Sequence, residues 1–237
     1  MNRAEETAAA VGSAAADDLP ARYGGCTDLT LSLRAGVLAI GLNRPAKRNA
    51  IGVEMTLDLE RTLLAVHDDR EVAVVVFHGH GGNFSAGMDM RDFFDHSTRA
   101  PAQIARARRA TDRWRARLLR RLPQPIVCGV AGYCLGGALP ILECADIVLA
   151  DPAATFGLPE INFGFVPGGP IAKTMRTAAS VRGASFAALT GRPFDARQAE
   201  RWGLVTRIAD TADVVGEALR LAAAIAHPTE LTADTTP

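Results

Sequence analysis

The chain has 237 residues, of which 48% are hydrophobic and 22% are charged, so it can bury a core without disulfides or bound metal. Its 26 basic and 26 acidic residues cancel, which excludes an overall field that attracts nucleic acid or membrane surfaces. Its four cysteines, Cys26, Cys128, Cys134 and Cys144, lack C-x-x-C spacing and the density of a secreted disulfide scaffold, so we expect reduced thiols.

The first part of the chain predicts a tail, a hairpin and a helix that leads into a strand. Residues 1–25 contain few large apolar side chains and cannot offset the entropy lost on ordering, so we expect a disordered tail. Apolar residues alternate over residues 29–42 around Ala35-Gly36, which indicates a β-hairpin. Helical spacing over residues 55–66 and an apolar run over 72–77 predict a helix and a buried strand.

The order of helix and strand returns in the middle of the chain. Helices are predicted over residues 101–121 and 139–144, and strands over 126–130 and 146–150. Strands that alternate with helices are typical of an α/β domain. Further along we expect helices over 168–178, 181–189, 196–202 and 211–226, one strand over 204–208, and a disordered end from residue 228.

Two glycine-containing turns each join a predicted strand to a helical stretch. They read Asn-Phe-Ser-Ala-Gly-Met-Asp at residues 83–89 and Ala-Gly-Tyr-Cys-Leu-Gly-Gly-Ala at residues 131–138. Backbone N–H groups at the start of a helix favour an anion, and glycine lets the backbone approach a ligand closely. Each turn alone is more typical of simple packing, but two such turns could aim at one oxygen.

A third segment supplies a candidate acid or base. Residues 155–164 read Thr-Phe-Gly-Leu-Pro-Glu-Ile-Asn-Phe-Gly and place Glu160 among apolar and glycine residues. Such surroundings desolvate a carboxylate and raise its pKa.

The two turns, about 50 residues apart, and the later isolated glutamate together resemble the crotonase superfamily, also called the enoyl-CoA hydratase/isomerase family. The resemblance runs from about residue 29 to residue 226. It implies an α/β fold in which residues 26–194 form a spiral of β-β-α turns and residues 195–237 a shortened helical C-terminal region. It also implies a homotrimer or a dimer of trimers, with the last helices packed across subunits.

The resemblance assigns roles to particular residues. In this family an oxyanion hole would be formed by the backbone N–H groups of Met88 and Gly137. Losing one such donor typically costs ~2.7–4 kcal/mol in the transition state. The coenzyme A contacts would come from Lys47, Arg48, Ala50, Ala86 and Asp89, although solvated loop charges are an alternative for the first two.

One catalytic position departs from the family pattern. Hydratases of the family usually have a glutamate three residues after the oxyanion glycine, where this chain has Pro140. Proline can neither hold nor donate a proton, so Glu160 would be the only acid/base of the usual pair. Glu143 lies one turn further and would either enter the vacated space or be solvated or ion-paired.

The local sequence is most similar to the hydroxycinnamoyl-CoA (feruloyl-CoA) hydratase-lyases, which also use only the later glutamate. The resemblance lies at residues 86–89 and 154–164, followed by Pro167-Gly168. Those lyases hold the substrate phenol with a tyrosine, whose place is taken here by Phe93, and this argues against a phenolic substrate.

We therefore expect an enoyl hydratase or hydratase-lyase that acts on an acyl-CoA or a carrier-bound acyl thioester. The alternatives are a Δ3,Δ2-enoyl-CoA isomerase, which needs only one base, and a noncatalytic thioester-binding relative. No prosthetic group is implied, because coenzyme A is part of the substrate.

Other ligands and locations are not expected. His67, His78, His80 and His96 lack metal-ligand spacing, and the nine arginines between Arg99 and Arg121 spread around their helix instead of forming a nucleic-acid face. No apolar run reaches the roughly 18 residues of a membrane span, and the N-terminus lacks a signal-peptide pattern. We expect a cytoplasmic protein without membrane association.

Overall fold

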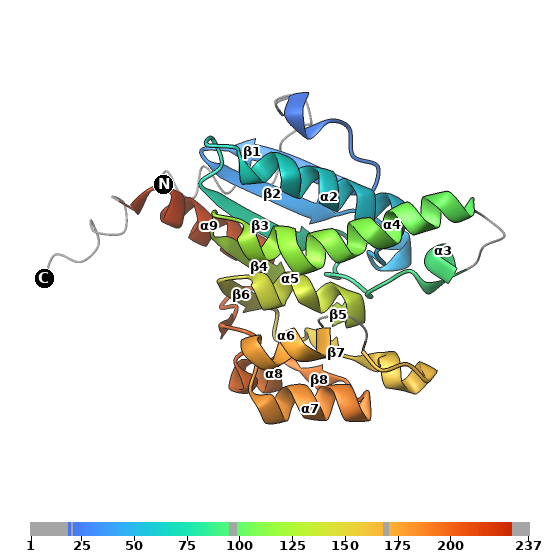
Figure 1. The fold of residues 1–237 in the computed structure, drawn as a ribbon. Coiled ribbons are helices and arrows are strands. Elements are labelled where there is room, and N and C mark those ends of the chain that lie inside the picture. The colour runs from blue at the N-terminus through green and yellow to red at the C-terminus, as the bar shows by residue number, and fades with distance from the viewer. Residues whose placement is uncertain (1–18, 20, 95–98, 168–170, 229–237) are drawn as a thin grey trace, which may run out of the picture.

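Two β-sheets organise the chain in a computed structural model that describes residue 19 and residues 21–94, 99–167 and 171–228. The predicted hairpin is present as β1 (Leu29–Arg34) and β2 (Val37–Leu42), and it is followed by β3 (Val74–Gly79), β4 (Ile126–Val130), β6 (Ile147–Ala150) and β9 (Arg207–Ile208). These strands form one sheet in the order β1-β2-β3-β4-β6-β9, and all pairs after the hairpin are parallel (Figure 1). A smaller sheet contains β5 (Tyr133–Leu135), β7 (Thr155–Gly157) and β8 (Phe194–Asp195), in that order.

The helices lie close to their predicted positions. They are α2 (Val53–His67), α3 (Met90–Phe94), α4 (Pro101–Arg113), α5 (Leu139–Cys144), α6 (Ile171–Ala178), α7 (Val181–Thr190), α8 (Ala196–Trp202) and α9 (Val214–Ala226). The helix predicted over residues 101–121 is continued after α4 by a π-helical turn, Trp114–Leu118, and a 3-10 turn, Leu119–Arg121. The strand predicted over residues 204–208 is confirmed only at its last two residues, and residues 168–170 lie outside the described part of the chain.

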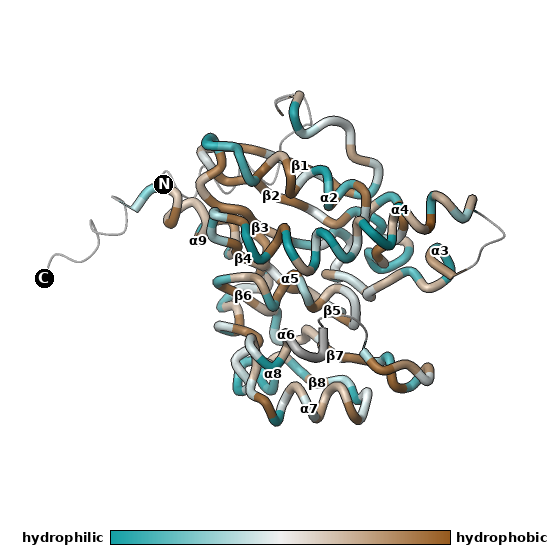
Figure 2. Tube along the Cα trace, viewed as in Figure 1, coloured by the Kyte–Doolittle hydropathy of each residue, from teal (hydrophilic) through white to brown (hydrophobic). Residues whose placement is uncertain are grey.

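The apolar runs of the central strands arise because both faces of the large sheet are covered. In β2, Leu38 and Ile40 belong to the main core, whereas Val37 and Ala39 face a second core made with α9. The strands β3 and β4 divide their residues in the same way, as expected for parallel strands buried on both faces. Figure 2 shows hydrophobic residues along these strands and a mixture of hydrophobic and hydrophilic residues along α4.

The C-terminal residues belong to both sheets. β8 crosses the predicted boundary between residues 194 and 195 and pairs with β7 in the small sheet. β9 lies after this boundary and pairs with β6 in the large sheet. The last helix, α9, packs against β2, β3 and β4. It approaches β4 closely at Gly129, where a Cβ atom would lie 3.1 Å from Val214 O. Residues 195–228 are therefore packed into the same unit as the predicted spiral core.

The end of the predicted N-terminal tail is ordered, which corrects the boundary at residue 25. Ala21–Tyr23 form a 3-10 turn, and the Tyr23 side chain is completely buried in the main core. Its hydroxyl donates to Asp69 Oδ2 at 2.6 Å, and Arg22 Nε donates to the same oxygen at 2.7 Å. One aromatic residue with a buried partner thus anchors a segment of otherwise weak composition. Residues 1–18 and 20 lie outside the described residues.

We expect the Tyr23→Phe substitution to lower the free energy of unfolding by about 1–3 kcal/mol, because the buried Asp69 carboxylate loses a hydrogen bond. Urea unfolding followed by circular dichroism measures this loss. The matched control is Tyr133→Phe, which removes an exposed hydroxyl and should change stability little. Equal urea midpoints for wild type and Tyr23→Phe would show that the hydrogen bond from Tyr23 to Asp69 does not stabilise the segment of residues 21–23.

Candidate active site

The first predicted turn, residues 83–89, leaves the carboxyl end of β3 and is fixed to the loop before α2. Three backbone hydrogen bonds of 2.7 to 2.9 Å join them, from Ala86 to Arg48, from Ile51 to Gly87 and from Asp89 to Ile51. The Ser85 hydroxyl, fully buried, donates to Asn49 O at 2.7 Å and accepts from Gly87 N–H at 3.1 Å. Ser85 therefore acts within the turn as a structural residue.

The second predicted turn, residues 131–138, is paired directly with the first. Ser85 N–H donates to Tyr133 O at 2.8 Å, and Leu135 N–H donates to Ser85 O at 3.0 Å. Gly87 has a φ of 90°, and a Cβ atom there would lie 2.7 Å from Leu135 O and 3.3 Å from Gly137 N. The two turns can touch because residue 87 has no side chain.

The backbone groups of Met88 and Gly137 meet at this contact. The Met88 N–H has no acceptor among the residues that the structure describes. Gly137 lies in the 3-10 turn Gly136–Ala138 that leads into α5, where the first N–H groups have no acceptor within the helix. The Met88 side chain also lies against Gly137, since a Cβ atom on Gly137 would be 2.6 Å from Met88 Cγ. Two N–H donors from neighbouring turns suit a single anionic oxygen.

The carboxylate of Glu160 lies on the second turn. Glu160 belongs to the 3-10 turn Pro159–Phe163, and a Cβ atom on Gly136 would lie only 2.8 Å from Glu160 Oε1. Burial raises the pKa of Glu160, while its own backbone N–H and the charge of Arg115 oppose this rise. Glu160 Oε2 is buried and has no hydrogen-bond partner among the described residues. A half-buried carboxyl with a raised pKa is suited to proton transfer.

Arg115 is a site residue that the sequence did not single out. It lies in the π-helical turn after α4 and is only 9% exposed. Its Nη2 donates to Gly137 O at 2.9 Å and contacts Met88 Sδ at 2.6 Å, so it touches both turns. Burial lowers the pKa of Arg115 to about 10, although Asp112, Glu160 and Glu143 act against this shift, and the group stays charged at neutral pH.

Hydratases of the family usually have a glutamate at the position that Pro140 occupies here. Pro140 is buried at the start of α5. Glu143 has a completely buried side chain, and its Oε2 lies 3.9 Å from Arg120 Nη2. The structure therefore supports the ion-paired interpretation of Glu143. Phe93, where the lyases have tyrosine, is 3% exposed and packs with Val53 and Ala107.

The residues predicted to contact coenzyme A gather beside the first turn. Asp89 accepts from Lys47 Nζ and from Arg44 Nη2, each at 3.1 Å. Burial alone would raise the pKa of Asp89, but the hydrogen bonds from Lys47 and from the Asp92 backbone hold it below the usual value. The Arg48 guanidinium lies 5.2 Å from the centre of the Tyr133 ring. The carbonyl groups of Ala50 and Arg48 accept from Arg44 Nη1 and Ala86 N–H.

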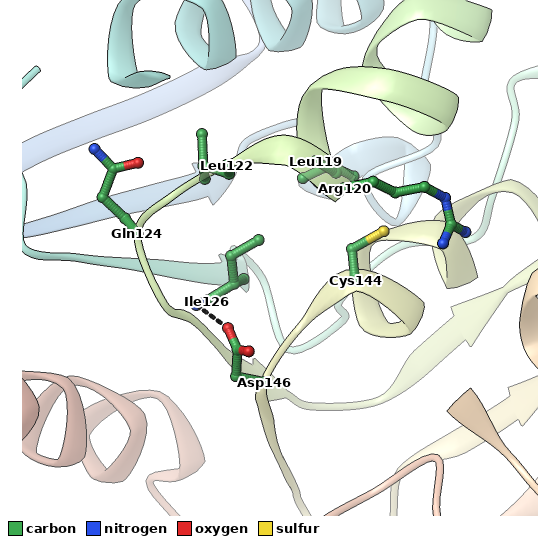
Figure 3. Close-up of a pocket in the computed structure, with 7 residues that line it drawn as sticks. All are labelled: Leu119, Arg120, Leu122, Gln124, Ile126, Cys144 and Asp146. Atoms are coloured by element: carbon green, nitrogen blue, oxygen red, sulfur yellow. Dashed lines mark hydrogen bonds between the residues drawn. The ribbon is translucent and has the colours of Figure 1, made fainter. Parts of the chain in front are cut away.

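Two surface cavities lie away from these residues. One, of about 230 Å³, is at the amino ends of β4 and β6, opposite the edge where the turns emerge; Leu119, Arg120, Leu122, Gln124, Ile126, Cys144 and Asp146 line it (Figure 3). The other, of about 680 Å³, is lined by residues of α2 with Arg22 and Arg106.

The described residues contain no group of three or more potential metal ligands. No helix within them is both long and apolar enough to cross a membrane.

Comparison with known proteins relates the chain to one family of enzymes. A family model described as Enoyl-CoA hydratase/isomerase matches residues 32–235. A hydroxycinnamoyl-CoA hydratase-lyase from Pseudomonas fluorescens is 32% identical over 176 residues, covering 74% of this chain and 64% of the lyase. The match thus spans less than two thirds of that relative. A mevalonyl-coenzyme A hydratase from Aspergillus fumigatus is 34% identical over 197 residues, covering 81% of this chain and 69% of the relative.

Solved structures share the fold. An enoyl-CoA hydratase/isomerase from Mycobacterium paratuberculosis superimposes with a TM-score of 0.77 at 28% identity, covering 89% of this chain and 84% of that chain. Another, from Pseudoalteromonas atlantica, gives a TM-score of 0.73 at 30% identity, covering 87% and 80%. The predicted fold class, an α/β spiral of the crotonase type, is confirmed by these neighbours.

The burial of Glu160 predicts a pH-dependent change in stability when it is replaced. A carboxyl whose pKa is raised on folding binds its proton more tightly in the folded state, so stability falls as pH rises from the usual carboxyl pKa through the raised one. We therefore expect Glu160→Gln to have a higher Tm than wild type at pH 7 and the same Tm near pH 3. Differential scanning calorimetry with the exposed Glu200→Gln as control measures this. A lower Tm for Glu160→Gln at pH 7 would contradict it.

Proposed function

Because this chain belongs to the enoyl-CoA hydratase/isomerase family, we propose that it adds water to an enoyl thioester with an oxyanion hole and a single glutamate. The observation that carries the proposal is the contact of the two turns at Gly87 and Gly137, with the Glu160 carboxylate against the same backbone. Acyl-CoA chemistry of this kind needs no prosthetic group, since coenzyme A enters as part of the substrate.

In the proposed reaction the thioester oxygen binds the N–H groups of Met88 and Gly137. The oxygen of a water molecule bonds to C3 while Glu160 takes a proton from that water. The electrons of the C2=C3 bond move onto the thioester oxygen, where the two N–H groups stabilise the negative charge. Glu160 then returns its proton to C2 as the thioester carbonyl forms again, and one water has been added.

A lyase step could follow at the same residues. Once Glu160 removes the proton of the new 3-hydroxyl group, the C2–C3 bond can break and release an aldehyde and a thioester enolate. The similarity to the hydroxycinnamoyl-CoA hydratase-lyase supports this extension. Phe93 has no hydroxyl group to hold a phenol, so we propose a non-phenolic acyl group.

Isomerisation of a Δ3 to a Δ2 double bond is the second candidate. It is favoured by Pro140, which leaves Glu160 as the one carboxyl of the usual pair, because moving a proton between C2 and C4 needs only one base. A relative that binds thioesters without turning them over is the third candidate.

The coenzyme A end of the substrate is proposed to lie along Lys47, Arg48, Ala50, Ala86 and Asp89. The pairing of Lys47 with Asp89 positions the ammonium group beside the first turn, and Arg48 lies over Tyr133. The cationic side chains of Lys47 and Arg48 can bind phosphate groups from these positions. A thioester on a carrier protein presents the same type of phosphate through its phosphopantetheine arm.

A cytoplasmic location is proposed for the protein, and the four free thiols are consistent with such a reducing compartment.

A homotrimer or a dimer of trimers is proposed for the assembly. Four large apolar side chains are exposed directly after Glu160: Ile161, Phe163, Phe165 and Val166. Phe163 is 70% exposed and Val166 is 77% exposed. They lie in the gold segment that extends away from the sheets in Figure 1. An apolar patch of this kind, next to the candidate site, suits burial against another copy of the chain.

The proposed function is tested by mass spectrometry of crotonyl-, 3-enoyl- and cinnamoyl-CoA incubated with the protein in ordinary and heavy water. We expect addition of water, or aldehyde release, and a roughly 100- to 10,000-fold loss in Glu160→Gln. Glu200→Gln is the control. Deuterium uptake with a shifted double bond and no gain of water would instead identify an isomerase, and binding without conversion a noncatalytic relative.

The assembly is tested by introducing charge into the exposed apolar patch. We expect wild type to sediment as a trimer or hexamer and the double variant Phe163→Asp, Val166→Asp to dissociate, because ionised side chains cannot be buried there without a partner. Analytical ultracentrifugation measures the mass, and circular dichroism checks the fold. Leu64→Asp, at an exposed leucine of α2, is the control. A monomeric wild type, or an unchanged mass in the double variant, would exclude this interface.

A further inference from the structure

Two buried polar atoms of opposite character lack partners beside the second turn. Arg115 Nε–H is a donor and Glu160 Oε2 is an acceptor, and neither has a hydrogen-bond partner among the described residues. An unmade hydrogen bond of a buried group costs about 1–3 kcal/mol, and more when the group is charged. A ligand that completes both hydrogen bonds is one physical explanation for such a pair.

Both atoms belong to side chains that rest on adjacent glycines. Glu160 Oε1 lies 2.8 Å from the position of a Cβ atom on Gly136, and Arg115 Nη2 lies 2.4 Å from that on Gly137. Neighbouring Cα atoms are ~3.8 Å apart, so the two charged groups are held within about a nanometre of each other. The described residues nevertheless contain no ion pair within 4.0 Å between Arg115 and Glu160. The two groups therefore lie near one another without a direct ion pair.

The remaining contacts of Arg115 fix its direction. Nη2 is held by Gly137 O and Met88 Sδ, and the guanidinium carbon lies 5.1 Å from the Trp114 ring centre. The guanidinium is planar, so anchoring Nη2 also limits where Nε–H can point. The π-helical turn that carries Arg115 is a geometry that occurs often at functional sites.

We propose that Arg115 Nε–H and Glu160 Oε2 hold one oxygen atom between them, first that of the attacking water and then that of the 3-hydroxyl group of the product. This inference rests on the proposed water addition and extends it with a second residue. The oxygen accepts a hydrogen bond from Arg115 and donates its proton to Glu160. Its free electron pair then bonds to C3, and Glu160 passes the proton to C2.

Arg115 thereby replaces the orienting role of the glutamate that is absent at Pro140. It does not replace the proton transfer, because an arginine with a pKa of about 10 stays protonated in the working range. Glu160 handles both protons, while Arg115 sets the direction from which the oxygen approaches. A hydroxylated thioester should therefore bind more tightly than the same thioester without the hydroxyl group.

The test compares the affinities of 3-hydroxybutyryl-CoA and butyryl-CoA by isothermal titration calorimetry, with the fraction of 3-hydroxybutyryl-CoA that is dehydrated measured by mass spectrometry of the same sample. We expect the wild-type protein to bind one enantiomer of the hydroxylated ligand roughly tenfold to a hundredfold more tightly. In Arg115→Met and in Arg115→Lys this preference should fall to about onefold. Arg117→Met, an exposed arginine of the same π-helical turn, is the control and should keep it.

The outcomes separate this proposal from the proposed function. A wild-type protein without preference for the hydroxylated ligand overturns the site, even if neither Arg115 variant folds. Equal weakening of both ligands in Arg115→Lys, with the preference kept, would assign Arg115 a structural role only and also overturn it. A preference that depends on Arg115 in a protein that adds no water would support the hydroxyl site and reject the reaction.

Discussion

The parallel register of β3 and β4 is the constraint on which the candidate site depends. Val75 to Phe77 pair with Ile126 to Cys128, so both strands end at the same edge of the sheet and both turns emerge there. The pairing continues beyond the strands through the bridge between Ser85 and Cys134. Hydrogen bonds between backbones thus determine the distance between Met88 and Gly137, and the side chains around them only adjust it.

The sequence predicts the parts of this structure that depend on local chemistry. Apolar alternation identified the hairpin of β1 and β2, and apolar runs identified β3 and β4. The glycine turns after β3 and β4 located the backbone that meets at Gly87. The strands β5, β7 and β8 have only two or three residues, too few for a period to be recognised. Arg115 could not be chosen among nine similar arginines, since its burial depends on which side of the helical stretch meets the second turn. The same limit applies to Tyr23, whose partner Asp69 is 46 residues away.

Buried charge occurs in the candidate site and also elsewhere in the fold, at Asp58, Glu60 and Asp69. Arg115 and Glu160 are held near neutral backbone groups and have incomplete hydrogen bonding among the described residues. The buried carboxylate of Asp58, by contrast, accepts from the N–H groups of Thr27 and Asp28 and from Arg61. This contrast separates a region built for stability from one where stability is given up for chemistry.

The position of α9 in the chain has a consequence for biosynthesis. The outer face of the central sheet, with Val37, Val74 and Val127, is covered by this last helix, more than 80 residues after β4 has been made. On the ribosome, a row of aliphatic side chains therefore remains open to water until α9 has emerged. Exposed hydrophobic surface of this kind makes incomplete chains prone to aggregation and a target for chaperones, so completion of the fold waits for the synthesis of α9.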